Sequence, residues 1–204
     1  MLQEKFVRDF LTLWATIDPI STLLIFVAVT RGMDRERRNR TALKATLYSG
    51  AILLGSIIIG QVILAALGVS LVSFQVAGGI ILFLFALQFT FGKLTSGEVP
   101  HGDGDHDLAV YPLAVPSIAT PGAIIAAIVL TDNHIYPIPV QAGTALITVL
   151  ILFVTYWMMR AADRILHVLG QQGAELLVRV MGLILASLSV ELILGALRMG
   201  NIIP

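Results

Sequence analysis

The chain has 204 residues, of which 57% are hydrophobic and 13% are charged, and its formal net charge is zero. So few charged residues cannot cover the apolar surface of a soluble domain of this length, so the composition excludes a soluble protein and predicts an integral membrane protein. The balanced charge indicates no nucleic acid or acidic partner, and the absence of cysteine excludes disulfides and thiol chemistry.

Six segments are long and apolar enough to cross a bilayer as helices, which takes about 20 residues each. They run over residues 10–30, 42–68, 71–92, 108–131, 140–159 and 174–197. None of them alternates in polarity as a barrel strand does, so we predict an all-α, multi-pass membrane protein with six transmembrane helices. The first segment is too long and too interrupted to be a cleaved signal peptide.

Lysine and arginine are distributed unevenly over the links between these segments. Ten of the thirteen fall on one side of the membrane: Arg31, Arg35, Arg37, Arg38, Arg40, Lys44, Lys93, Arg160, Arg164 and Arg179. The other side has Lys5, Arg8 and Arg198. The positive-inside rule therefore predicts a cytoplasmic arginine loop and two outward-facing termini. Contact with anionic lipid is a further role open to the basic loop.

The chain repeats itself at an interval of 102 to 103 residues. "GIILFLFALQFTFG" at 79–92 aligns with "GLILASLSVELILG" at 182–195, and "ILAALG" ending at Gly68 aligns with "ILHVLG" ending at Gly170. Pro19 likewise aligns with Pro121. We predict one transmembrane domain, 1–204, made of repeat one (1–92), a cytoplasmic linker (93–107) and repeat two (108–204).

Each predicted repeat holds three helices, and an odd number reverses the direction of the second copy in the membrane. Inverted-topology repeats are typical of secondary transporters, whose binding site lies near the middle of the membrane where the repeats meet. The sequence therefore predicts two inverted three-helix repeats.

The first and fourth predicted helices are each interrupted near their middle. Pro19 lies in "DPISTLLIF", and Pro121 lies in "VPSIATPGA" together with Pro116 and Gly122. One proline kink in a membrane helix is usually only structural, but two at equivalent places predict paired broken helices buried in protein or facing a water-filled cavity. Both second halves would then begin near mid-membrane with free N–H groups, which suits a carboxylate.

Asp18 has three candidate roles beside this interruption. An acidic side chain at the centre of a membrane helix costs about 2.5–3.5 kcal/mol and is by default a functional candidate. It could bind the ammonium group of a zwitterion, carry a coupling proton, or only cap the half-helix that begins at Pro19.

Several other polar or small residues are candidates for proton coupling or helix packing. Glu191 is a candidate for proton coupling, although a hydrogen bond between helices is the simpler interpretation, and Gln88 occupies the equivalent position in the first repeat. Gly78 and Gly79 favour close helix packing over substrate contact. The run "HGDGDHD" at 101–107 is best interpreted as a solvated linker, not a metal site. No catalytic constellation is visible, so we expect no enzyme activity, cofactor or metal.

The same stretches resemble the MarC/SnatA family, and they cover nearly the whole chain. They are "DPISTLLIF", "FQVAGGIIL", "PLAVPSIATPGA" and "RVMGLILASLSVE". The resemblance implies a six-helix inner-membrane protein of prokaryotes and, for part of that family, transport of small neutral amino acids. The chain departs from the family pattern at Ser21 and Thr120, where glycine is usual, at Gln75, where arginine is common, and at Glu191, where glutamine is frequent.

Together these observations predict a secondary transporter in the cytoplasmic membrane that works by alternating access. Its expected partners are the lipid bilayer and a small amino acid zwitterion such as alanine, glycine or serine, with proton coupling as an open possibility. The predicted substrate site comprises Asp18, Pro19, Ser21, Thr22, Thr120, Pro121, Gly122 and Ala123. A channel of the same architecture, or an exporter of other small solutes, is the alternative.

Overall fold

The computed structural model describes residues 2–91 and 108–200, and these residues form helices and no strand. The elements are α1 (Leu2–Ile17), α2 (Pro19–Val29), α3 (Arg35–Ala66), α4 (Leu71–Phe91), η1 (Ala109–Ile118), α6 (Pro121–Leu130), α7 (Ile138–Arg160) and α8 (Ala162–Met199). The all-helical prediction is confirmed for this part of the chain.

Over the described residues, five helical stretches are long and apolar enough to cross a membrane. They are Leu2–Val29, Arg35–Ala66, Leu71–Phe91, Ile138–Arg160 and Glu175–Met199. The pair η1 and α6 qualifies as a sixth span, bent by 54° at its break. The segments predicted from hydropathy therefore overlap these spans, although the first begins eight residues and the second seven residues earlier than predicted.

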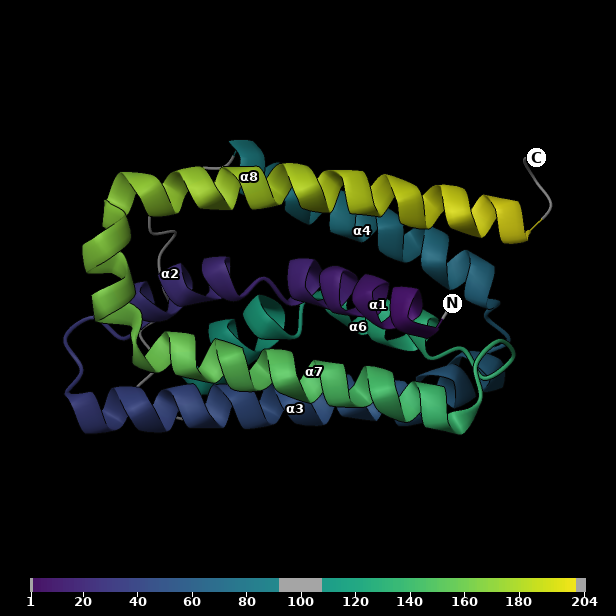
Figure 1. Ribbon diagram of the computed structural model, residues 1–204, viewed down its shortest axis with the longest axis horizontal. Coiled ribbons are helices and arrows are strands. Elements are labelled where there is room, and N and C mark those ends of the chain that lie inside the picture. Colours follow the sequence, from purple (N-terminus) through teal and green to yellow (C-terminus); the bar gives the residue numbers. More distant parts are fainter. Residues whose placement is uncertain (1, 92–107, 201–204) are drawn as a thin grey trace.

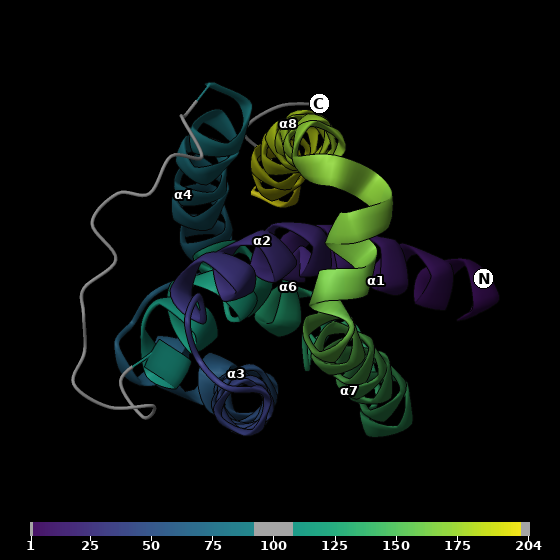
Figure 2. The same ribbon diagram turned by 90° about the vertical axis from the view of Figure 1, so that its left-hand side faces the viewer.

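The helices lie in three layers (Figures 1 and 2). The short elements α1, α2, η1 and α6 form the middle layer, between the pair α3 and α7 on one side and the pair α4 and α8 on the other. Within the outer layers, α3 contacts α7 and α4 contacts α8. The two chain breaks at Asp18 and Thr120 are thereby buried between the unbroken spans, as irregular backbone in a membrane requires, whereas Tyr111 and Val115 of η1 are exposed.

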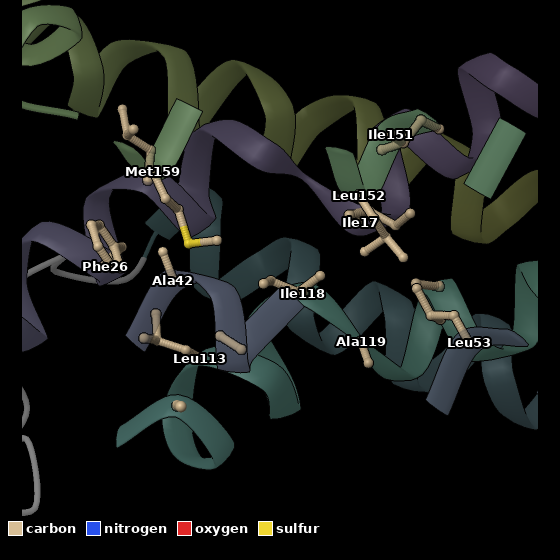
Figure 3. Close-up of a cluster of buried hydrophobic side chains, with 14 of the residues drawn as sticks. Ile17, Phe26, Ala42, Leu53, Leu113, Ile118, Ala119, Ile151, Leu152 and Met159 are labelled. Atoms are coloured by element: carbon tan, nitrogen blue, oxygen red, sulfur yellow. The ribbon is translucent and has the colours of Figure 1, made fainter. Parts of the chain in front are cut away.

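The buried side chains join the middle layer to α3 and α7 (Figure 3). Ile17 and Phe26 of the first span pack in one cluster with Ile118 and Leu113 of η1. Small residues such as Ala42, which is fully buried on α3, let the backbones approach closely. Close packing matters because lipid tails are as apolar as leucine, so helix association depends on van der Waals contact and hydrogen bonds.

Contacts between the two halves of the chain occur in matching pairs. α3 packs on η1 and α6, and in the same way α7 packs on α1 and α2. α4 contacts α6 as α8 contacts α2, and α1 contacts α6 as α2 contacts η1. Gly68, after α3, and Gly170, within α8, both have left-handed φ angles, of 67° and 66°, and they lie 102 residues apart in the sequence.

The two ends of the bundle differ in charge. The α2–α3 link and the α7–α8 corner lie at one end, and both described termini lie at the other (Figure 1). Arg35, Arg38, Arg160 and Arg164 line one pocket at the first end. Which end faces the cytoplasm stays a prediction from the positive-inside rule.

Gly182 is a point of close approach between α8 and α4. A Cβ atom at this position would lie 2.9 Å from the backbone nitrogen of Thr90 and 3.0 Å from the carbonyl oxygen of Ala86. Backbone atoms cannot rotate away as a side chain can, so only glycine allows this approach.

We expect Gly182→Ala to lower the free energy of unfolding by about 1–3 kcal/mol, the usual cost of overpacking. Gly55→Ala is the matched control, because a Cβ there meets nothing within 4 Å and Gly55 lies inside helix α3. Unfolding of the purified proteins in detergent measures both. Equal stability of the two variants would contradict the close approach of α4 and α8.

Candidate functional site

The first span is interrupted at Asp18, between α1 and α2. Asp18 has a left-handed backbone conformation, with φ 48° and ψ 73°, which aspartate and asparagine tolerate better than most residues. Pro19 then begins α2 at the position where a missing N–H is harmless. The carboxylate of Asp18 accepts hydrogen bonds from the Ser21 amide, at 3.2 Å, and from the Ser21 hydroxyl. Asp18 is therefore the N-cap of α2.

The second interruption separates η1 from α6, and here too a capping side chain and a proline begin the second helix. η1 is an irregular helical segment in which Tyr111 and Val115 have extended backbone angles. Thr120 caps α6, because its hydroxyl accepts a hydrogen bond from the amide of Ala123 at 2.9 Å. Pro121 is the first residue of α6, as Pro19 is of α2.

The two interruptions contact each other directly. The Thr120 hydroxyl donates to the carbonyl of Thr16, at the end of α1, over 2.7 Å. The Thr22 hydroxyl, at the start of α2, donates to the Ser117 carbonyl at 3.2 Å, and the Ser117 hydroxyl lies 3.1 Å from that of Thr22. The start of α6 is thus hydrogen-bonded to the end of α1, and the start of α2 is hydrogen-bonded to the end of η1.

These bonds replace backbone bonds that the interruptions remove. In a continuous helix the Ser117 carbonyl would accept from the backbone N–H of residue 121, but Pro121 has none. The hydroxyl of Thr22 takes that place. Because a carbonyl without a donor is costly inside a membrane, the contact between the two spans satisfies backbone that neither span can satisfy alone.

The site is closed to solvent in this conformation. Asp18 is 1% exposed, Ser21 3%, Thr22 0% and Thr120 6%. Gly122 and Ala123 are also buried, and a Cβ on Gly122 would run into Leu82 of α4. The structure therefore brings all the predicted site residues into two adjoining chain segments that are packed against each other.

One feature of the predicted site is wrong. The half-helix starts were expected to present free N–H groups, but the amides of Ser21 and Ala123 already donate to Asp18 and Thr120. Local side chains compete effectively for the first amides of a helix, and a single-sequence argument from helix dipoles does not account for them. A bound anion would have to displace these caps.

A cavity of about 1060 Å³ lies beside the site, between α1, α4 and α8. Thr12 and Ala15 of α1 line it, one turn or less from Thr16. Gln75 of α4 also lines it, donating from Nε2 to the Leu192 carbonyl at 3.0 Å. Its Oε1 atom is buried and has no hydrogen-bond partner among the described residues.

Other predicted residues lie outside the two interruptions. Glu191 lines the cavity and places Oε1 3.7 Å from Nη1 of Arg198. Gly78 packs against Ile125 of α6 and Gly79 against α8, whereas Gln88 is exposed on α4. The loop 101–107 lies outside the described residues. Within the described part of the chain, no three His, Cys, Asp or Glu side chains are placed to hold a metal ion.

Sequence reasoning missed two groups of residues. The first group is Thr16 and Ser117. Each is a hydroxyl residue within four positions before a proline, and that position is the signal in the sequence that points to them. The second group is a buried ion pair in α1: the Lys5 ammonium bonds the carboxylate of Asp9, which is 1% exposed. Lys5 also donates to the Leu130 carbonyl at 3.2 Å and to the Thr144 hydroxyl at 3.3 Å.

This ion pair connects three elements at the end of the bundle that contains the N-terminus. The Thr144 hydroxyl of α7 donates to Asp9 Oδ2 at 2.6 Å, and Leu130 is the last residue of α6. Lys5 Nζ also lies 4.1 Å from the centre of the Tyr136 ring. The pairing at i and i+4 lets Asp9 be buried inside α1, and the helix begins at Leu2, before the apolar run, with residues 2–4 exposed.

Comparison with known proteins gives one consistent result. Residues 3–200 match the family model described as "MarC family integral membrane protein". A membrane protein of Methanocaldococcus jannaschii is 31% identical over 96% of this chain and 97% of its own length. The membrane protein YhcE of Escherichia coli is 30% identical over 94% and 91%. The E. coli inner membrane protein YhgN is 31% identical over 90% and 91%. No solved structure matches the chain.

Replacing Asp9 tests the buried ion pair. Asp9→Asn leaves the Lys5 ammonium without a counter-charge in a buried place, and we expect a loss of about 3–5 kcal/mol in unfolding free energy. Glu36→Gln is the control, because Glu36 pairs with Arg40 at 2.9 Å in the same i and i+4 spacing but its side chain is 79% exposed. Denaturant titration in detergent compares them. A similar, small effect of both variants would show that the Lys5–Asp9 pair is not buried.

Proposed function

Because the chain belongs to the MarC family of integral membrane proteins, we propose that it is a secondary transporter of small neutral amino acids that works by alternating access. The observation that carries the proposal is that each capped half-helix start hydrogen-bonds the first half of the other broken span, next to the buried carboxylate of Asp18. Neither the family description nor the relatives' names state a substrate, so the proposal rests on the site.

The paired contacts between the two halves support an inverted repeat. If residues 1–92 and 108–204 are related by a two-fold axis, each contact between the halves must occur twice, with the roles exchanged. The pairs α3 with η1 and α7 with α1, and α4 with α6 and α8 with α2, follow this rule. The matching left-handed glycines 102 residues apart agree with it. Rocking of two such halves around a central site is the usual mechanism of this architecture.

The chemistry of the interruptions fits an amino acid zwitterion. Asp18 offers a carboxylate to an ammonium group. The starts of α2 and α6 carry about half a positive charge each from their helix dipoles, and both begin within the site. When the halves move, a substrate carboxylate can replace the Asp18 and Thr120 side chains as acceptor for the amides of Ser21 and Ala123. Substrate binding and cap release would then occur together.

The side chains at the site favour a small solute. Ser21, Thr22, Ser117, Gly122 and Ala123 are all short, and each is buried. Leu82 closes the space beside Gly122. These dimensions support alanine, glycine or serine over larger amino acids, and the closed state of the site supports a gated transporter over a continuous pore.

The cavity between α1, α4 and α8 is the proposed route to the site from the end that contains the N-terminus. It is lined by Thr12 and Ala15, next to the interruption, and by Gln75 and Glu191. With the arginine-rich end in the cytoplasm, as the positive-inside rule predicts, this route opens outside the cell. The proposed location is the cytoplasmic membrane of a prokaryote.

The first experiment is uptake into proteoliposomes with a panel of labelled amino acids, with and without a pH gradient. We expect saturable uptake and counterflow for small neutral amino acids. Conduction that does not saturate would indicate a channel, and no flux of any amino acid would overturn the substrate assignment.

Asp18→Asn separates the charge of Asp18 from its structural role. Asparagine caps helices as well as aspartate and also tolerates the left-handed conformation, so α2 and the chain path should be kept. We expect uptake to be lost while the unfolding midpoint of the purified protein changes little. Uptake with unchanged kinetics would show that Asp18 only caps α2. Asp18→Ala removes the charge and the cap together, so we expect it to destabilise the protein as well as stop uptake.

Glu191→Gln tests proton coupling through the cavity. Glu191 faces Arg198 and is 57% exposed, so its replacement should leave the fold unchanged. If the glutamate carries the coupling proton, the variant loses the stimulation of uptake by a pH gradient while counterflow, which needs no net proton movement, persists. Wild-type stimulation in the variant would exclude Glu191.

A further inference from the structure

A basic pocket lies at the opposite end of the bundle from the termini. It has a volume of about 470 Å³ and is formed where the start of α3 meets the corner between α7 and α8. Four arginines line it, Arg35, Arg38, Arg160 and Arg164, with Asp163 as the one acidic residue of its lining. The lining therefore carries a net charge of about three positive units.

The arginines come from both halves of the chain. Nη1 of Arg38, on α3, lies 3.0 Å and 2.8 Å from the two carboxylate oxygens of Asp163, on α8. Arg38 is only 21% exposed in its side chain, and its guanidinium lies 5.5 Å from the Phe26 ring centre. Asp163 thus fixes one arginine in the wall of the pocket and cannot neutralise the other three.

The wall of the pocket is partly apolar. Phe26, Met33 and Met159 contribute to it, and Phe26 and Met159 are almost fully buried. Trp157 lies at the rim and is 50% exposed, with the Arg160 guanidinium 5.3 Å from its ring centre. An exposed tryptophan beside arginines at the end of a membrane span is typical of the headgroup level of a bilayer.

We propose that this pocket binds a phosphate-bearing anion, supplied by the headgroup of an anionic phospholipid. One guanidinium group can donate two parallel hydrogen bonds to two oxygens of a phosphate. Four arginines in one pocket lining therefore favour a phosphate-bearing anion. A basic pocket between helices at the membrane surface is suited to such headgroups. The half-exposed Trp157 in the pocket lining favours the lipid over free phosphate, because inorganic phosphate has no apolar group to place against it.

This inference does not depend on the transport proposal. The pocket lies at the arginine-rich end, whereas the two interruptions and the cavity beside them are lined by other residues. A bound headgroup would join α3 of the first half to α7 and α8 of the second, so its effect is expected on stability whether or not the protein carries amino acids.

The test titrates detergent-solubilised protein with three probes and follows the unfolding midpoint. The probes are short-chain phosphatidylglycerol, short-chain phosphatidylcholine and inorganic phosphate. We expect a rise in the midpoint that saturates with phosphatidylglycerol and is absent with phosphatidylcholine. A comparable rise with inorganic phosphate would assign the site to the phosphate group alone, and no rise with either anion would overturn the proposal.

Variants decide whether any effect comes from this pocket. Arg35→Gln and Arg164→Gln should each weaken phosphatidylglycerol binding about fivefold, the effect of about one arginine near a charged surface. Asp163→Asn should strengthen binding, because it removes the one negative charge while keeping the shape. A purely structural role of these residues would not produce changes of opposite sign.

Arg40→Gln is the matched control. Arg40 lies on the same helix as Arg35 and is paired with Glu36, outside the pocket lining. The proposal predicts wild-type lipid affinity for this variant. If Arg40→Gln and Arg164→Gln weaken binding equally, the lipid is held by general surface charge and the pocket assignment is overturned.

Discussion

The hydrogen bonds between the two chain interruptions are the constraint on which the rest of the structure depends. A membrane span with a proline in its middle leaves a carbonyl without a donor, and lipid offers no substitute. Here the Thr22 hydroxyl bonds the carbonyl that Pro121 leaves free, and Thr120 bonds the carbonyl of Thr16. These backbone carbonyls of each broken span have a hydrogen-bond donor only when the other broken span lies beside it.

The layered arrangement follows from this pairing. Because unpaired backbone at the breaks must be kept from lipid, the breaks at Asp18 and Thr120 lie in the middle, between the unbroken pairs α3 with α7 and α4 with α8 (Figure 2). Glycine and alanine at the contacts let the covering helices approach, as at Gly182 against the backbone of α4. The same enclosure buries Asp18, whose carboxylate accepts its hydrogen bonds from Ser21.

The bonds that join the interruptions are also easily exchanged. They are made by hydroxyl groups of Thr22, Ser117 and Thr120, which can rotate without moving the backbone. A solute with one negative and one positive group could take over the caps and leave the rest of the bundle intact. Exchangeable hydrogen bonds of this kind fit the proposed transport cycle.

The positions of the spans and of their interruptions can be predicted from the sequence, whereas the contacts between distant residues cannot. Span positions and the interruptions follow from long apolar runs and from Pro19 and Pro121, which are strong local signals. The partners of Thr16 and Ser117, and the burial of the Lys5–Asp9 pair, depend on residues more than 90 positions away, about which local composition says nothing. The sequence allows Asp18 either to cap α2 or to leave its amides free for a substrate, and only the structure shows that Asp18 and Thr120 both accept from the first amides of their helices.

Cross-linking the two interruptions tests the central claim most directly. The chain has no cysteine, so Thr22→Cys and Ser117→Cys can be combined without other changes, at positions whose hydroxyls lie 3.1 Å apart. The account predicts that the double variant forms an intramolecular disulfide in the membrane, that amino acid uptake stops on oxidation, and that reduction restores it. The same oxidant should leave uptake by each single variant at that variant's own reduced rate. A folded double variant that does not cross-link, or a cross-linked protein that transports at the reduced rate, would contradict the account.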